Sequence, residues 1–529
     1  MELSHSQTTA QKNQTSHFWV TYILPLIGLC ALIVFLRVPT IHDSLGRDAG
    51  IYAYIGEHIS QGDVLYRDLW DHKPPGIHYL LAVLFRIFPA QIETVAIFEI
   101  IWLCGLIIFF YLVAQRIFGR YAAFLAALMA AIYFASFQVI EYAGMTETYA
   151  VFFGLLAVWL TYQALERAKG WWWVLVGAAL GAALLMRQTA VVVIVPLGVY
   201  ASVLFYRRQN LFSHVVGMWG KVLAGMIGII ALPAIFFAIE GAWSQMMRAV
   251  FGFNQAYASS LSLVDSWQML PEAFLHSPLE RWPALSVIGI GGLLVGVLMK
   301  KYRAEWLFLT GWLLIEILGL SLGGRFYAHY FLHFVIPLAL LSGFLFSAVP
   351  RLMVCQVIGV VGVVAFLFSH SPLLVDGPRF TSWVSGVVSE ESVTSDETFG
   401  EQKNLALAWL QTHTMPGEPV YFWGAEAELN FISKRPSVGV FPFVYPLLVR
   451  SYTTQEDLDR FIADFERVQP QYVIDTSGTN TATPNLDADT GELGDRLFSR
   501  QAALPVMTYI TSHYVKEESV GDWVVWRRR

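Results

Sequence analysis

Long apolar runs separated by short polar loops constrain the fold of this chain more than any other feature. A helix needs about 20 apolar residues to cross the hydrocarbon core of a bilayer, where it satisfies its backbone hydrogen bonds internally. By this criterion we identify roughly eleven candidate spans. Their approximate limits are residues 18–38, 93–115, 121–139, 147–165, 171–187, 189–206, 215–238, 283–299, 304–322, 327–348 and 352–370. We therefore predict an α-helical, polytopic membrane protein.

The composition supports this prediction. Hydrophobic residues make up 56% of the 529 residues and charged residues 14%, whereas about 25% of the residues in soluble domains are charged. The net charge of -6 provides no basic surface, so we expect membrane lipids as partners and no nucleic acid. Cys30, Cys104 and Cys355 lie inside apolar runs and indicate neither a disulfide framework nor a thiolate metal site.

The distribution of Lys and Arg predicts the orientation, because these residues accumulate in short cytoplasmic loops. The basic residues that fall at alternate turns are Arg116, Arg120, Arg167, Lys169, Arg207, Arg208, Lys300, Lys301, Arg303 and Arg351. All of them lie on one side if the N-terminus is cytoplasmic. We therefore expect a cytoplasmic tail (1–17), a transmembrane domain (18–370) whose first run is a retained anchor, and an extracytoplasmic domain (371–529).

The first outer loop, residues 47–76, combines charge, aromatic residues and proline in the stretch RDAGIYAYIGEHISQGDVLYRDLWDHKPPG. Apolar residues at helical spacing follow Asp48 and indicate an amphipathic helix on the membrane surface that ends near Gly62. Pro74 and Pro75 restrict the backbone around Lys73 and predict a stiff turn. The next run, 77–88, is too short to span easily and favours a re-entrant or interfacial helix.

The tail has the composition of a small α/β domain. We expect a short helix at 404–410, a turn and strand in PGEPVYFWG, and a helix that starts with a capping box at Thr454 and Asp457. Further strands are expected at 471–474 and 523–526, and a loop at 476–495.

Three acidic residues are candidates for chemistry. Asp48 begins the surface helix and is either a general base or a helix cap. Asp71 is either a second active-site carboxylate or the ion-pair partner of Lys73. Glu147, in the stretch EYAGMTE that begins at Glu141, lies where a polar loop enters the membrane, which indicates a functional residue or a helix-start carboxylate.

The candidate cations lie at the same predicted membrane face. Arg187 interrupts a long apolar stretch and is either a site residue or an arginine that extends to lipid headgroups. Arg325, His329 and Tyr330 gather in GGRFYAHY at another outer boundary, where His329 is either a phosphate donor or a structural hydrogen-bonder. A leaving phosphate needs such cations, because preorganised charges stabilise the developing anion.

The sequence offers no clear motif for other chemistries. No HExxH, Cys/His cluster or Walker loop stands out, the GxSxG spacing occurs only as GLSLG at 319–323 within an apolar run, and DxD occurs only at 457–459 and 487–489 in the tail. We therefore predict no cofactor and no metal site, and the sequence leaves dependence on a divalent cation open.

Three stretches resemble the GT-C glycosyltransferases related to protein O-mannosyltransferases and bacterial aminoarabinose transferases, especially the RgtA/B/C/D-like branch. They are RDAGIYAYIGEHISQGDVLYRDLWDHKPPGIHYL, EYAGMTETYA and GGRFYAHYFLHFVIPLALL. The first is the most specific, since an acidic residue soon after the first span, followed by Lys-Pro-Pro, is typical of the family. The similarity covers roughly residues 18–370 and is weak over the tail.

The resemblance implies an inverting hexosyl- or pentosyltransferase in a bacterial inner membrane that takes a sugar from a polyprenyl-phosphate donor. The acceptor would be a lipid, a glycan or a protein. Asp48 matches the family's catalytic carboxylate, and Lys73 matches its donor-phosphate lysine. Arg187 and the segment 325–330 match further parts of the donor pocket, whereas Glu147 stands where many relatives have Asp.

Two other function classes are compatible with a polytopic chain. A transporter or flippase of polyprenyl-linked glycans would place ionisable residues near the middle of the membrane in discontinuous helices, whereas here they concentrate at one face. A noncatalytic envelope-assembly protein would depend on its tail and would tolerate loss of Lys73.

Overall fold

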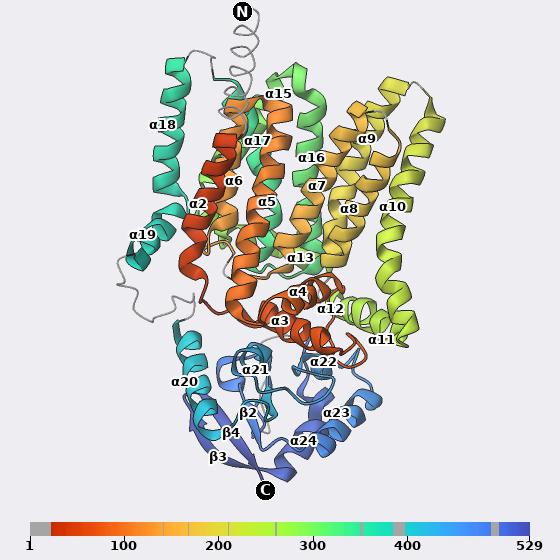
Figure 1. Ribbon diagram of the computed structural model, residues 1–529, viewed down its shortest axis with the longest axis vertical. Helices are drawn as coiled ribbons and strands as arrows, with labels where there is room; N and C mark the ends of the chain where they lie inside the picture. The colour runs from red at the N-terminus through yellow and green to blue at the C-terminus, as the bar shows by residue number, and fades with distance from the viewer. Residues whose placement is uncertain are drawn as a thin grey trace, which may run out of the picture.

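The computed structural model describes residues 23–140, 142–167, 169–209, 211–259, 262–349, 353–384, 397–487, 493 and 497–529. The N-terminal tail (1–17), the beginning of the first predicted span, Glu141 and Arg351 lie outside the described residues. In Figure 1, a bundle of long helices occupies one half of the molecule and the C-terminal α/β region (397–529) occupies the other.

The helices of the bundle correspond to the predicted spans. They are α2 (Leu24–Arg37), α5 (Ile92–Phe118), α6 (Arg120–Ala135), α7 (Thr146–Arg167), α8 (Trp171–Met186), α9 (Ile194–Gln209), α10 (Phe212–Ile239), α15 (Ala284–Leu298), α16 (Arg303–Gly323), α17 (Val335–Ser347) and α18 (Met353–His370). Among the described residues, 6 helices are long and apolar enough to cross a membrane, or 8 if each of two bent pairs is one span. The remaining predicted spans are the shorter helices α2, α6 and α8. The polytopic helical fold is confirmed, and the number of spans stays a prediction.

Glycines allow helices of the bundle to pack closely, as is common in membrane proteins. An added Cβ at Gly177 of α8 would lie 1.8 Å from the carbonyl oxygen of Val222, and one at Gly225 of α10 would lie 1.9 Å from that of Val174. Any larger side chain at either position would therefore push α8 and α10 apart.

Shorter elements connect the helices at both ends of the bundle. They are α11 (Trp243–Met247), a π-helical segment (Arg248–Phe253), α12 (Asn254–Ala258), α13 (Leu263–Leu275), α14 (Pro278–Arg281), α19 (Leu373–Val384) and the 3-10 segments Val38–Thr40, Gln188–Val193, Lys300–Tyr302 and Ala328–Phe334. Helix α19 packs against α2, although the predicted boundary at residue 371 assigns it to the tail.

Helices α3 (Gly46–Gln61) and α4 (Gly76–Ile87) lie across the end of the bundle, between it and the C-terminal α/β region (Figure 1). The predicted helix that ends near Gly62 is present: Gly62 follows α3 with a φ of 119°, which glycine adopts without strain. Helix α3 is buried on most of its surface, because the C-terminal region covers the face that the bundle does not.

The C-terminal α/β region contains a four-stranded sheet in the order β1-β2-β4-β3, with β1 and β2 parallel and the other pairs antiparallel. The strands are β1 (Val420–Trp423), β2 (Tyr472–Asp475), β3 (Tyr514–Val520) and β4 (Trp523–Arg528), and the helices are α20 (Glu397–His413), α21 (Ala427–Ser433), α22 (Tyr445–Leu448), α23 (Gln455–Val468) and α24 (Leu504–His513). The predicted capping box at Thr454 and Asp457 is present. Strand β3 was not predicted, because it is an edge strand whose polar residues are exposed.

Specific contacts hold the C-terminal α/β region against the first loop. The indole N–H of Trp70 donates to the Tyr452 hydroxyl at 2.9 Å, and the Trp70 backbone N–H donates to a carbonyl oxygen of the same region at 2.7 Å. At the far end of α3, Lys434 forms an ion pair with Glu57 at 2.9 Å. The catalytic loop predicted from the sequence is therefore enclosed between two parts of the molecule.

Candidate active site

Asp48 and Lys73 meet at the end of the bundle that faces the C-terminal α/β region. Asp48 lies in the first turn of α3, and Lys73 lies on the turn that precedes α4. The Lys73 Nζ atom is 4.0 Å from Asp48 Oδ2. The Asp48 side chain is 46% exposed and that of Lys73 is 14% exposed. A carboxylate that a second substrate can reach thus lies beside a largely buried ammonium.

Asp71 holds the turn that carries Lys73. Its buried carboxylate accepts hydrogen bonds from the backbone N–H groups of His72 at 2.6 Å and Lys73 at 3.3 Å, and it pairs with the His78 ring at 2.7 Å. The Tyr66 hydroxyl donates to the Lys73 carbonyl oxygen at 2.8 Å. Burial alone would raise the pKa of Asp71, but the hydrogen bonds from His72 and His78 hold it well below its usual range.

Glu147 and Arg187 form a buried ion pair in the same part of the bundle. Glu147 lies in the first turn of α7, and Arg187 follows the last residue of α8. The guanidinium donates directly to the carboxylate, and their side chains are 11% and 1% exposed. The His329 Nε2 atom lies 3.6 Å from the same Glu147 oxygen.

Aromatic rings lie beside Arg187 and Arg325. The Arg187 guanidinium carbon lies 4.3 Å from the centre of the Tyr330 ring, and that of Arg325 lies 4.9 Å from the Tyr257 ring. The His329 and Tyr330 rings contact each other edge to face at 4.8 Å. Such stacking orients a guanidinium while its edge remains able to donate hydrogen bonds.

The two groups of charged residues form one polar site. An added Cβ at Gly76 would lie 2.5 Å from the Leu185 carbonyl oxygen, so the start of α4 directly contacts the end of α8, which Arg187 follows. Burial alone would lower the pKa of Lys73, but the nearby Asp48 carboxylate raises it above its ordinary value. Lys73 is therefore a cation beside the Asp48 carboxylate.

Comparison with known proteins agrees with this architecture. Residues 72–236 match the family model described as Dolichyl-phosphate-mannose-protein mannosyltransferase. The fold is similar to that of ArnT from Cupriavidus metallidurans bound to undecaprenyl phosphate, with a TM-score of 0.53 at 16% identity over 96% of this chain and 98% of that one. The chain therefore shares the fold of this glycosyltransferase, and residues 72–236 match a glycosyltransferase family model.

Two further solved structures have a similar fold. ArnT from C. metallidurans in the apo state has a TM-score of 0.52 at 16% identity, over 97% of this chain and 98% of that one. The Archaeoglobus fulgidus oligosaccharyltransferase, tethered to an acceptor peptide that contains the NVT sequon, has a TM-score of 0.51 at 13% identity, over 97% of this chain and 75% of that one. The sequence has no significant match among curated proteins.

A second buried ion pair near the site was not identified from the sequence. Arg37 at the end of α2 lies 3.6 Å from Glu99 of α5, and Glu99 also accepts a hydrogen bond from the backbone N–H of Gly144. An added Cβ at Gly144 would lie 3.2 Å from that of Ala49. The pair thus holds the loop before α7 against α3. The signal in the sequence that could have identified this pair is Glu99, a charged residue inside an apolar run.

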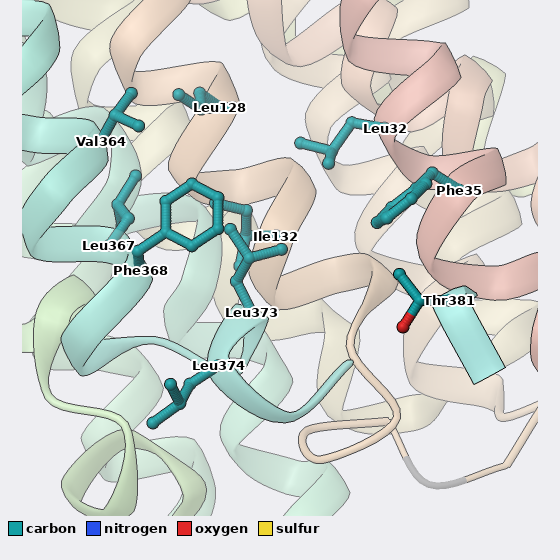
Figure 2. A pocket seen from close by; sticks show the side chains of 10 residues that line it. All are labelled: Leu32, Phe35, Leu128, Ile132, Val364, Leu367, Phe368, Leu373, Leu374 and Thr381. Atoms are coloured by element: carbon teal, nitrogen blue, oxygen red, sulfur yellow. The ribbon is translucent and has the colours of Figure 1, made fainter. Parts of the chain in front are cut away.

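A cavity of the helical bundle lies away from these charges. It has a volume of about 600 Å³ and lies between α2, α6, α18 and α19. Figure 2 shows Phe368 of α18 and Leu373 of α19 on one side and Leu32 and Phe35 of α2 on the other. None of the predicted site residues lines it, and its walls are almost wholly apolar. Apart from Thr381 its lining is hydrocarbon, so it suits an apolar group better than a sugar.

Proposed function

We propose that this protein transfers a sugar from a polyprenyl-phosphate donor to an acceptor at the outer face of a membrane. The single observation that carries the proposal is the approach of the accessible Asp48 carboxylate to the buried Lys73 ammonium at 4.0 Å. At this separation a general base can take the proton of the acceptor while the cation binds the phosphate of the donor.

The reaction follows from this geometry. Asp48 removes the proton from the nucleophilic group of the acceptor as that group attacks the anomeric carbon of the donor sugar. The bond between this carbon and the phosphate oxygen breaks, and its electron pair leaves with the phosphate. Lys73 and Arg187 stabilise the negative charge that develops there, because their ion pairs with Asp48 and Glu147 hold both cations in place before the reaction begins. Attack opposite the leaving phosphate inverts the anomeric configuration.

The other predicted residues support these three. Glu147 and Asp71 were candidates for direct catalysis, but their burial and their partners favour positioning roles, in which Glu147 orients Arg187 and Asp71 orients the backbone of Lys73. His329, Tyr330 and Arg325 line the donor side of the site through their contacts with Glu147, Arg187 and Tyr257.

The proposed orientation rests on the ends of the helices. Arg116 pairs with Glu166, and Arg208 donates to the Leu165 carbonyl oxygen, so the ends of α5, α7 and α9 meet at the end of the bundle opposite the C-terminal α/β region (Figure 1). Basic residues favour the cytoplasmic side. We therefore propose that the active site and the C-terminal region lie outside the cytoplasm; the family resemblance suggests that the membrane is the inner membrane of a bacterium.

The two solved relatives suggest the substrates. ArnT binds undecaprenyl phosphate, and the archaeal oligosaccharyltransferase holds an acceptor peptide. A polyprenyl-phosphate sugar is accordingly the donor that we propose for this chain, and its acceptor is a lipid, a glycan or a protein.

Transfer by purified Asp48→Asn protein tests the proposal. Membranes with and without the wild-type chain are first given a panel of radiolabelled polyprenyl-phosphate sugars to find the donor. With that donor we expect Asp48→Asn to lose a factor of about 10² to 10⁴ in turnover. Asp63→Asn is the matched control, because Asp63 is a similarly exposed acid (45%) just beyond the other end of α3. Wild-type turnover by Asp48→Asn would remove Asp48 from its role.

A further inference from the structure

Helix α3, which carries Asp48, is capped by a residue of the C-terminal α/β region. The first backbone N–H groups of a helix have no partner within the helix, and a side-chain oxygen at the N-cap usually accepts from them. The N-cap residue of α3 is Leu45, whose side chain has no such oxygen. The backbone N–H of Leu45 donates instead to Glu428 Oε1 at 2.5 Å.

Glu428 binds the beginning of α3 through several contacts. The Ser44 hydroxyl lies 2.8 Å from Glu428 Oε1 and 3.0 Å from Oε2, and it also accepts from the Gly46 backbone N–H at 3.1 Å. Lys403 of α20 forms an ion pair with Glu428 and donates to the Ser44 hydroxyl at 2.9 Å. The carboxylate is buried, so it acts at short range on the positive end of the helix dipole.

The backbone geometry permits this contact only because residue 50 is glycine. An added Cβ at Gly50 would lie 2.3 Å from Glu428 Cβ and 2.9 Å from Glu428 Cα. Glycine in a helix is normally less favourable than alanine. Its presence in α3 is explained by the close approach of α21, which brings Glu428 to the first turn.

A neighbouring glutamate makes a similar contact. The Arg47 Nε atom lies 3.0 Å from Glu426 Oε1, and Glu426 is itself buried and accepts from the Thr476 hydroxyl at 2.8 Å. The residues immediately before Asp48 are thus held by two acids of one short segment. Buried ion pairs contribute little net stability on average, and the role they serve best is to select one geometry.

We propose that Glu428 is a positioning residue for the transfer reaction: it caps α3 from the C-terminal α/β region and thereby fixes Asp48 relative to Lys73. This inference rests on the proposed function for its catalytic consequence. It makes the C-terminal α/β region part of the catalytic unit, in addition to any part it has in choosing the acceptor.

The test compares full-length variants in detergent or nanodiscs by hydrogen exchange and by turnover with the donor that the wild type uses. Glu428→Ala should speed amide exchange across 45–53 and lower kcat by about tenfold to a hundredfold, since misplacement by about 1 Å costs up to 10²-fold. The donor KM should change by less than about twofold, because Lys73 and Arg187 are untouched. Glu428→Gln should recover part of the loss, because its amide oxygen still accepts from Leu45.

Two further variants make the result decisive. Glu57→Gln removes an ion pair across the same interface at the far end of α3 and should leave both measurements at their wild-type values. Gly50→Ala should reproduce the loss through steric separation, and it replaces Glu428→Ala if that variant does not fold.

The outcomes separate the two proposals. Faster exchange in Glu428→Ala with kcat equal to that of Glu57→Gln would overturn the positioning role, and unchanged exchange would overturn the cap itself. Absence of transfer by the wild-type chain with every donor would overturn the proposed function, whereas the exchange measurement would still decide whether Glu428 caps α3.

Discussion

The ion pair between Glu147 and Arg187 offers the sharpest prediction about the donor side of the site. Glu147→Gln keeps the size of the side chain and removes its charge, so Arg187 remains buried without its anion. Removing one partner of a buried pair costs about 3 to 5 kcal/mol. Arg187 also donates to the Thr189 hydroxyl at 2.7 Å and stacks on Tyr330, which places the expected cost near the lower limit, about 3 kcal/mol.

The matched control lies on the same helix. Glu166, near the other end of α7, pairs with Arg116, and their side chains are 36% and 55% exposed. Exposed pairs contribute at most about 1 kcal/mol. Glu166→Gln should therefore unfold at nearly the wild-type temperature, whereas Glu147→Gln should unfold at a clearly lower one. Thermal unfolding of the purified proteins in detergent measures the difference.

A phosphate lipid should restore stability to Glu147→Gln. The phosphate of undecaprenyl phosphate would supply the anion that Arg187 has lost, and a ligand present at 100 times its Kd stabilises a protein by about 2.7 kcal/mol. We expect the lipid to raise the unfolding temperature of Glu147→Gln more than that of the wild type. The reasoning is refuted if Glu147→Gln is as stable as Glu166→Gln, or if the lipid stabilises the wild type more than the variant.

Three further predictions test the lysine turn and the helix packing. Lys73→Met should raise the donor KM about tenfold to a hundredfold through loss of a charged hydrogen bond. The ratio of this KM to the wild-type KM should stay constant from about pH 6 to 9. The raised pKa of Lys73 keeps the ammonium charged, and so keeps its contribution to donor binding, until the pH rises above about 10.4. A ratio that falls within this window in steady-state assays would contradict the role of Lys73 in donor binding. Asp71→Asn should destabilise the protein by about 3 kcal/mol at neutral pH. Because the pKa of Asp71 is lowered in the folded protein, its contribution to stability is complete above about pH 4 and declines as the pH falls further. The unfolding curves of the variant and the wild type should therefore converge only in acid. Gly225→Val should lower the unfolding temperature by separating α8 from α10. Gly228→Val on the same helix should not lower it, because no atom lies within 4 Å of a Cβ added at Gly228. Equal effects of the two changes would exclude close helix packing as the cause.

Local patterns in the sequence were sufficient to predict the helices of the bundle, the limits of α3 and the capping box of α23. Each depends on backbone hydrogen bonds or on the burial of apolar faces within a few turns, so the residues that decide it are neighbours along the chain. The shortness of α2, α6 and α8 was less predictable, because composition defines an apolar run and not the point at which a helix ends.

Tertiary structure alone decided which charges meet. The separation of Asp48 from Lys73, the pairing of Glu147 with Arg187 and the cap that Glu428 provides for α3 all join residues from different elements. No periodicity encodes such pairs, because they depend on how α4 meets α8 and how α21 meets α3 after the helices have formed. The sequence by itself therefore determined the membrane fold and the candidate residues, and packing between elements determined which of those residues share a site.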